Sequence, residues 1–256
     1  MKLKKQLFNL ILIFSSLLLH SQQSNCEKIF PFDSNEVLIF DIQYNFGLMW
    51  TNVGTLQFTS ETIVQNQTRY YNFKSESNTN ESWKWLYEIS STYDVMSSQT
   101  TLKPVKYFQS TKYWNHQYNY QYIFENDSIH LLIIKDKEVI NKSIKNDSLL
   151  FDGLSAIYYA RTIDFNSLTK GDSIEIDILH GDQLMKQKII FEGIDNLTHV
   201  NNEIISCFKF SSLIMNNLII SDKKPAQVWV TADDRRLPLK ISIEIIVGSV
   251  NIYLRE

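Results

Sequence analysis

Apolar side chains recur at every second position along much of the chain. The clearest stretches are residues 38–44, 118–124, 174–178, 239–245 and 250–254. Successive side chains of a β-strand point to opposite faces of the sheet, so this period predicts strands with one buried face. Strands of parallel sheets would instead be near-continuous apolar runs with helices between them. The sequence therefore predicts an all-β fold of antiparallel, meandering strands.

Short polar segments separate several of these runs. Residues 125–127, 180–182 and 233–235 contain Asn, Asp or Gly and stand between two strand-like stretches. Such residues supply or tolerate the dihedral angles of tight turns. Gly248 allows a further bend between the last two strands. We therefore expect hairpins at these positions.

One stretch departs from the alternation. From Leu154 to Arg161 the apolar residues fall at helical spacing, and Asp152 stands before them as a good N-cap. This pattern predicts a helix over about residues 153–163. It is the clearest helix signal in the chain.

The remaining segments are less regular. Residues 81–90 fit either a short helix or a strand with alternating aromatic side chains, and the polar stretches 76–82 and 141–148 are candidate loops. No linker or internal repeat interrupts the chain. We expect one β-rich domain over residues 27–256, with one or two short helices.

The first residues have the layout of a secretory signal peptide. Three of the first five residues are lysines, an uncharged apolar run follows from Leu7 to Leu19, and polar residues come next. The run is short for a membrane span, so we expect a signal peptide over residues 1–21 with cleavage after Ser21. An uncleaved N-terminal anchor is the alternative. The mature chain is expected to have no transmembrane span.

The chain has two cysteines, Cys26 and Cys207. Cys26 follows the leader closely, which raises a lipid anchor on it as a minority alternative, although the bulky Asn25 precedes it. In an exported chain the two cysteines can form one disulfide, or Cys207 can be a separate small core residue. The sequence leaves both alternatives open.

Catalytic and metal-binding patterns are scarce. The histidines have no metal-ligand spacing, and no phosphate-binding glycine loop occurs. Residues 153–157 resemble half of a nucleophile elbow around Ser155, but Ile157 replaces the second glycine. Residues 233–236 place two acids beside two arginines, which is more typical of a turn than of a paired-carboxylate site. We therefore expect no catalytic residue, metal or cofactor.

The one unusual feature of the composition is its many aromatic residues: 13 Tyr, 15 Phe and 5 Trp. Aromatic faces bind sugars and lipids, and they also fill β cores. Trp83, Trp85, Trp114 and Trp229 are weak candidates for ligand binding. Packing within the sheet is the more common use of such side chains.

Several motifs occur in a fixed order along most of the chain. They are residues 32–38, Tyr44, 53–55, 102–104, 152–161, 228–238 and 247–249. Together they resemble the exported bacterial family called domain of unknown function 3108. Here Asn35 and Val53 replace the Gly and Ala that are usual at two of these positions. The resemblance implies an exported envelope protein with a rolled or barrel-like sheet, and no established catalytic residues.

These observations favour a non-enzymatic protein of the periplasm or outer envelope that binds an apolar or glycan ligand, or a partner protein. A hydrolase whose residues converge only in three dimensions, and a structural or assembly protein, are the alternatives. The formal net charge of −3 does not indicate the basic surface that nucleic-acid binding requires.

Overall fold

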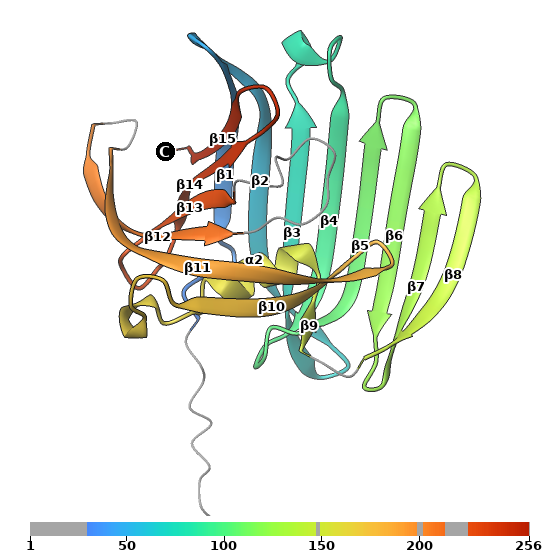
Figure 1. The fold of residues 1–256 in the computed structure, drawn as a ribbon. Helices are drawn as coiled ribbons and strands as arrows, with labels where there is room; N and C mark the ends of the chain where they lie inside the picture. Colours follow the sequence, from blue (N-terminus) through green and yellow to red (C-terminus); the bar gives the residue numbers. More distant parts are fainter. Residues whose placement is uncertain (1–29, 147–148, 199–201, 213–224, 256) are drawn as a thin grey trace, which may run out of the picture.

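The computed structural model describes residues 30–146, 149–198, 202–212 and 225–255. Within these residues the chain forms one sheet of fifteen strands, one α-helix and two short 3₁₀ turns. The predicted all-β, antiparallel and rolled architecture is confirmed (Figure 1). The expected signal peptide and Cys26 lie outside the described residues.

The strands follow one another with few other elements between them. They are β1 (Val37–Phe46), β2 (Met49–Gln65), β3 (Thr68–Thr79), β4 (Ile89–Ser98), β5 (Pro104–Tyr113), β6 (His116–Phe124), β7 (Ser128–Lys135), β8 (Glu138–Lys145), β9 (Leu150–Phe151), β10 (Ser173–His180), β11 (Gln183–Thr198), β12 (Ile204–Ser212), β13 (Ala226–Thr231), β14 (Pro238–Glu244) and β15 (Ser249–Leu254). The helix is α2 (Gly153–Ala160), and the 3₁₀ turns are Glu81–Trp83 and Phe165–Ser167.

The sheet is a meander in which the first and last strands meet. Its order is β8-β7-β6-β5-β4-β3-β2-β1-β15-β14-β13-β12-β11-β10-β9, and all neighbours are antiparallel except β9 and β10. Because β1 pairs with β15, the two free edges are β8 and β9, which follow each other in the chain. The sheet is therefore related to a barrel that is open between these two strands.

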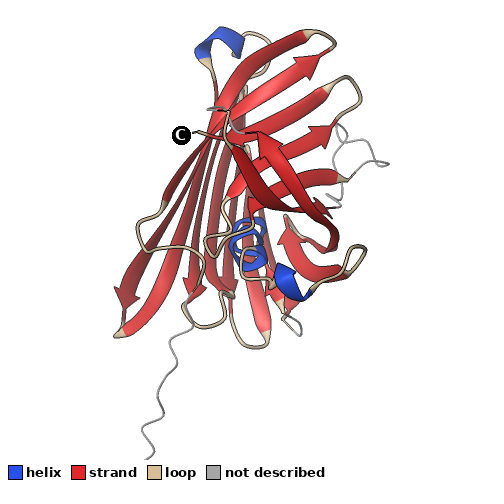
Figure 2. Cartoon of the chain, turned by 90° about the vertical axis from the view of Figure 1, so that its left-hand side faces the viewer, coloured by secondary structure: helices blue, strands red, loops and turns tan. Residues whose placement is uncertain are grey.

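The open sheet curls over the helix. β1–β8 form one broad layer, β10 and β11 cross in front of it, and α2 lies between (Figures 1 and 2). The tip of the β10–β11 hairpin reaches the inner face of the first layer, where Lys142 Nζ lies 3.2 Å from Asp182 Oδ2. This contact bridges the open side of the sheet.

The core fills the space between the layers. Phe40, Phe73, Val95 and Ile129 each have 0% exposure, and they are contributed by four different strands. Tyr158 of α2 stacks on Phe73 with ring centroids 3.8 Å apart. The alternation seen in the sequence thus places one face of each strand against the helix or the opposite layer.

The helix begins as predicted and ends earlier. Asp152 is the N-cap: its Oδ1 accepts from the backbone N–H of Leu154 at 2.8 Å and of Ser155 at 3.0 Å. Helical geometry ends at Ala160, and the N–H groups of Thr162 and Ile163 bond three residues back instead of four. The predicted extension to residue 163 was therefore too long.

Two predicted loops were partly wrong. Residues 76–79 belong to β3, and residues 141–145 belong to β8. Both segments are polar because few of their side chains pack into the core. Residues 81–90 form neither a helix nor a single strand along their whole length. A 3₁₀ turn over Glu81–Trp83 is followed by a loop and then by β4. The predicted turns at 125–127, 180–182 and 233–235 are confirmed, as is the bend at Gly248.

Candidate apolar cavity

A cavity of about 380 Å³, partly open to solvent, lies between α2 and the strands that cross in front of the first layer. The helix contributes Gly153, Ala156, Ile157 and Ala160 to its wall. Three of these residues are small, which keeps α2 from filling the space. The volume falls in the lower part of the range of about 300–1,000 Å³ that is typical of small-molecule sites.

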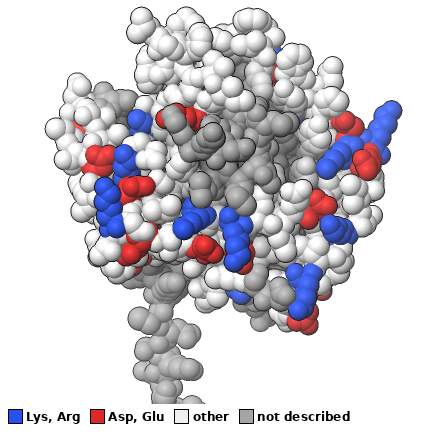
Figure 3. Space-filling view, in the orientation of Figure 1, with Lys and Arg blue, Asp and Glu red and all other residues white. Residues whose placement is uncertain are grey.

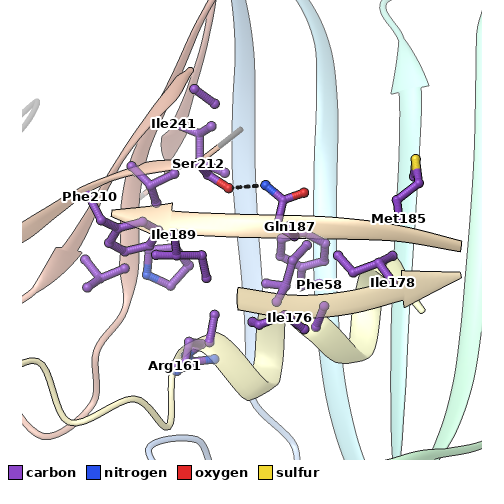
Figure 4. A pocket seen from close by; sticks show the side chains of 18 of the residues that line it. Phe58, Arg161, Ile176, Ile178, Met185, Gln187, Ile189, Phe210, Ser212 and Ile241 are labelled. Carbon is purple, nitrogen blue, oxygen red and sulfur yellow. Dashed lines mark hydrogen bonds between the residues drawn. The ribbon is translucent and has the colours of Figure 1, made fainter. Parts of the chain in front are cut away.

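The strands supply the rest of the wall through alternate residues. On β11, Met185, Gln187 and Ile189 face the cavity, while Lys186 and Lys188 between them face away. The other lining side chains of the front strands follow the same period within β10, β12 and β13. They are Ile176, Ile178, His180, Phe210, Ser212, Ala226, Val228 and Val230, joined by Pro238 and Ile241 of β14. Phe58 of β2 lines the cavity from the first layer (Figure 4). Nearly all of the wall is aliphatic or aromatic.

One polar pair interrupts this wall. Gln187 Nε2 donates to Ser212 Oγ across the β11–β12 pair, as the dashed line in Figure 4 shows. The carbonyl oxygen of Gln187 and the hydroxyl hydrogen of Ser212 keep further hydrogen-bonding capacity. The pair can therefore orient a single polar group of an otherwise apolar molecule.

Arg161 closes the cavity near the end of α2 without presenting a free charge. Its guanidinium donates to both carboxylate oxygens of Glu36, at 2.6 and 2.9 Å, and to the carbonyl oxygens of Pro31 and Arg235, at 2.9 and 3.0 Å. Arg161 is only 3% exposed. The two terminal nitrogens of Arg161 are bonded, whereas its buried Nε has no hydrogen-bond partner among the described residues. The pair is neutral overall, and it joins the first described segment, the helix and the β13–β14 turn.

His180 is the one histidine at the cavity, and it lies far from the hydroxyl group there. Partial desolvation beside the apolar side chains lowers the pKa of His180 below its usual value, although the residue as a whole remains exposed. His180 pairs with Gln183, whereas Ser212 pairs with Ile189. Six residues of β11 separate these positions, which is about 20 Å along a strand. His180 and Ser212 therefore form no nucleophile–base pair.

Ser155, the residue in the half-matched nucleophile elbow, is fully buried at 0% exposure. Its Oγ donates to Asp152 Oδ2 at 2.5 Å, and it accepts from the N–H of Asp152 at 3.2 Å. This is a capping box at the start of α2. The arrangement explains Ser155 as a helix-start residue.

The four candidate tryptophans lie outside the cavity wall. Trp85 and Trp114 are 75% and 45% exposed on turns at one end of the sheet, and Trp83 is half-buried beside them. Trp229 is 8% exposed on the outer face of β13, where it packs with Cys207 and Leu239. The structure thus does not bring the four together.

Trp229 is covered by its cross-strand neighbours. The Nζ atoms of Lys209 and Lys240 lie 4.8 and 4.9 Å from its ring centre, and its Nε1–H donates to Asp195 Oδ2 at 3.0 Å. Cys207, in the same cluster, has 0% exposure, and burial raises the pKa of its thiol to about 11. Its pairing with Cys26 stays a prediction, since Cys26 lies outside the described residues.

The acidic and basic residues of 233–236 serve the β13–β14 turn. The carboxylate of Asp233 accepts from Thr231 Oγ1, from Arg235 Nε at 2.9 Å and from the N–H of Arg236 at 3.2 Å. Among the described residues no group of three or more His, Cys, Asp or Glu side chains is placed to hold a metal ion.

The sequence does not predict this cavity, because its wall is made of ordinary strand residues. Ile176 and Ile178 stand out in the sequence as alternating apolar positions. The sequence does not show whether such a buried face packs tightly against the opposite layer or leaves a space between the layers. The small residues on one side of α2, Gly153, Ala156 and Ala160, are the signal that was available.

The fold and the cavity define a class of protein: an open, barrel-like antiparallel sheet that encloses an apolar interior. The chain belongs to the family described as "Protein of unknown function (DUF3108)", whose model matches residues 39–255. The resemblance noted from the sequence is thereby confirmed.

A solved structure has a similar fold. It is the beta-barrel-like protein of domain of unknown function DUF1849 from Brucella abortus, with a TM-score of 0.50 and 8% identity, covering 86% of this chain and 95% of that chain. At that identity the likeness concerns the fold alone. No match was found among curated proteins. In the described part of the chain, no helix has the length and apolar character that a membrane crossing requires.

Proposed function

We propose that this chain is an exported cell-envelope protein that binds an apolar, lipid-like ligand in the cavity beside α2, without catalysis. The observation that carries the proposal is the cavity itself: about 380 Å³ of space inside the sheet, walled by aliphatic side chains. Apolar side chains that line a partly open cavity stay in contact with water and lack packing contacts, which is unfavourable. An apolar occupant restores those contacts.

The chemistry of the wall favours an apolar ligand over a glycan. A sugar needs many hydrogen-bond partners and a ring face to stack on, whereas the cavity offers one polar pair, Gln187 and Ser212, and His180. The described tryptophans, which would supply stacking faces, lie elsewhere. An alkyl chain with one hydroxyl, ester or acid group matches this wall.

The alternative of a hydrolase has less support. Ser155 is used within the capping box, and His180 and Ser212 are separated along β11. A general base must reach its proton within hydrogen-bond distance, directly or through one water.

Export rests on the basic and apolar layout of residues 1–21 and on the family resemblance.

A binding titration with a cavity-blocking variant tests the proposal. Ile178→Trp adds a large ring inside the cavity, and Ile194→Trp adds the same ring at a position of β11 that is 69% exposed. We expect the reference protein and Ile194→Trp to bind a fluorescent fatty-acid probe with equal affinity. Ile178→Trp should weaken binding at least tenfold while keeping its unfolding transition. Equal binding by all three proteins would contradict the proposed site.

A further inference from the structure

The two ends of the first layer differ in the character of their turns. At one end, shown at the top of Figure 1, the turns carry exposed apolar side chains. We call the exposed residues 46–50, 85–87, 113–114 and 246–247 the apolar edge. At the other end the turns are polar, as in residues 65–67 and 99–101 and the β6–β7 turn.

The exposure of the apolar edge is high. Leu48 is 100% exposed, Trp85 75%, Ile246 74% and Trp50 57%. Single exposed apolar residues are common on protein surfaces and need no explanation. Here they recur on four successive turns at one end of one sheet, and contiguous apolar surface of this kind marks an interaction site.

The four turns form a continuous row. Tyr44 Oη donates to the carbonyl oxygen of Val247 at 3.0 Å, which ties the β14–β15 turn to the end of β1. β1 continues into the β1–β2 turn, and Asn80 of the next loop donates to Asn52 Oδ1 at 2.8 Å. The rings of Tyr87 and Tyr113 then lie 5.4 Å apart. Seven adjacent strands, from β15 to β6, therefore present a row roughly 30 Å long.

The edge carries almost no charge. Residues 46–50, 85–87, 113–114 and 245–249 contain no Asp, Glu, Lys or Arg. Glu88, Lys112 and Glu244 flank these segments, and the nearby Lys84 is paired with Glu81. Figure 3 shows the same distribution on one face, where the charged side chains lie at the flanks and below and the upper end is nearly uncharged. The row ends at the β7–β8 turn, where Asp136 bonds to His116.

We propose that the apolar edge docks on the surface of a lipid bilayer, with its turns inserted at the level of the headgroups. Trp and Tyr are enriched at that depth because each has an apolar body and a polar tip. The turns project separately and end at different heights in Figure 1, which a deformable interface accommodates more readily than a rigid protein face. A protein partner would require a flat or complementary face of about 800 Å². The inference does not depend on what occupies the cavity.

Because the edge is uncharged, the lipid needs no net charge. We expect the protein purified from the envelope fraction to float with phosphatidylcholine vesicles, and to do so also in about 1 M salt, where charge attraction is screened within about 3 Å. Leu48→Asp with Ile246→Asp should lower the vesicle-bound fraction about tenfold or more, since each removes an inserted apolar side chain. Both positions are exposed, so the fold should survive.

The matched control moves the same change elsewhere. Val64→Asp with Ile204→Asp replaces two aliphatic side chains that are 66% and 70% exposed but lie away from the edge. This variant should float like the reference. No flotation of the reference, or equal loss in both variants, would overturn the proposal. A change of the edge variant from dimer to monomer in light scattering would also overturn it, because a second copy would then be the occupant.

Tryptophan quenching excludes attachment through another part of the chain. Bromine on lipid acyl chains should quench the fluorescence of the reference protein, and a variant that combines Trp50→Phe, Trp85→Phe and Trp114→Phe should lose most of that quenching. Trp229 should contribute little, since it is only 8% exposed in the outer-face cluster. Flotation without quenching of Trp50 and Trp85 would show binding elsewhere and would reject the apolar edge.

Discussion

At the scale of single residues, several side chains that were candidates for a functional role have a structural role instead. The clearest case is Asp152, which is fully buried and caps α2 through its carboxylate. The capping role was predictable from the position of Asp152 before a helical pattern. The burial was not, because a sequence does not show that strands on both sides cover the helix start.

Asp152→Ala should lower the free energy of unfolding by about 0.5–2 kcal/mol through loss of the cap. Asp152→Asn keeps an accepting oxygen for the N–H groups of Leu154 and Ser155, so it is the matched control. Urea denaturation of the three proteins measures the difference. An unchanged midpoint for Asp152→Ala would contradict the capping role.

The same residue predicts a pH dependence. Burial raises the pKa of Asp152 in the folded state above its ordinary value. The folded state therefore binds this proton more tightly than the unfolded state, whose pKa is about 3.9. The cost of ionising Asp152 is absent below about pH 4 and grows as the pH rises through the folded-state pKa. Asp152→Asn should gain stability relative to the reference over that window. A constant difference between pH 4 and 8 would reject this.

The buried pair of Arg161 and Glu36 is a second residue-scale case. Arg161→Met should destabilise the protein by about 3–5 kcal/mol, because it leaves the Glu36 carboxylate without its partner in a buried site. Adding Glu36→Met should recover a large part of that loss. Thermal or urea unfolding of the two single variants and the double variant measures the coupling. Additive effects would contradict a direct pair.

At the scale of elements, the turns and hairpins were predicted better than their ends. Asn, Asp and Gly marked the hairpin turns correctly because such residues determine local dihedral angles. The strand ends at residues 76–79 and 141–145 were not predicted. Their side chains are polar, and they are strands because their backbone pairs with neighbouring strands. Long-range pairing is not visible in a local pattern.

Gly248 tests how closely the β14–β15 turn approaches β1. Its φ is +84°, and an added Cβ would lie 2.0 Å from the carbonyl oxygen of Asn45. Gly248→Ala should therefore lower stability by more than about 1 kcal/mol. Gly153→Ala is the control, because no atom lies within 4 Å of its Cβ position, and it should be neutral or slightly stabilising. Equal unfolding midpoints for the two variants would contradict the close approach.

Trp229 tests whether the outer face of β13 is packed. Trp229→Ala should cost roughly 3–5 kcal/mol, since it empties the cluster with Cys207 and Leu239. Trp85→Ala removes a ring that is 75% exposed and should change stability by less than about 0.5 kcal/mol. Calorimetry of both variants distinguishes packing from a binding role. A stable Trp229→Ala protein that no longer retained a co-purified ligand would assign that ring to binding.

At the scale of the whole molecule, the open sheet is the feature that gives this chain an interior. The strand order leaves the outer edges of β8 and β9 without a neighbouring strand, and the β10–β11 hairpin closes part of that gap through Lys142 and Asp182. The alternation of apolar residues predicted the sheet and its buried face. It did not predict the incomplete filling beside α2, which depends on how the small residues of the helix meet the curvature of β10–β14.

Mass spectrometry of the protein isolated from its native source, under conditions that keep noncovalent complexes intact, tests the central claim most directly. The account predicts a retained apolar molecule in the reference protein and in Ile194→Trp, and its loss in Ile178→Trp. Release of that molecule by organic solvent should identify an alkyl or lipid-like compound. A reference protein that carries nothing, or an Ile178→Trp variant that retains the same molecule, would contradict a ligand-binding cavity.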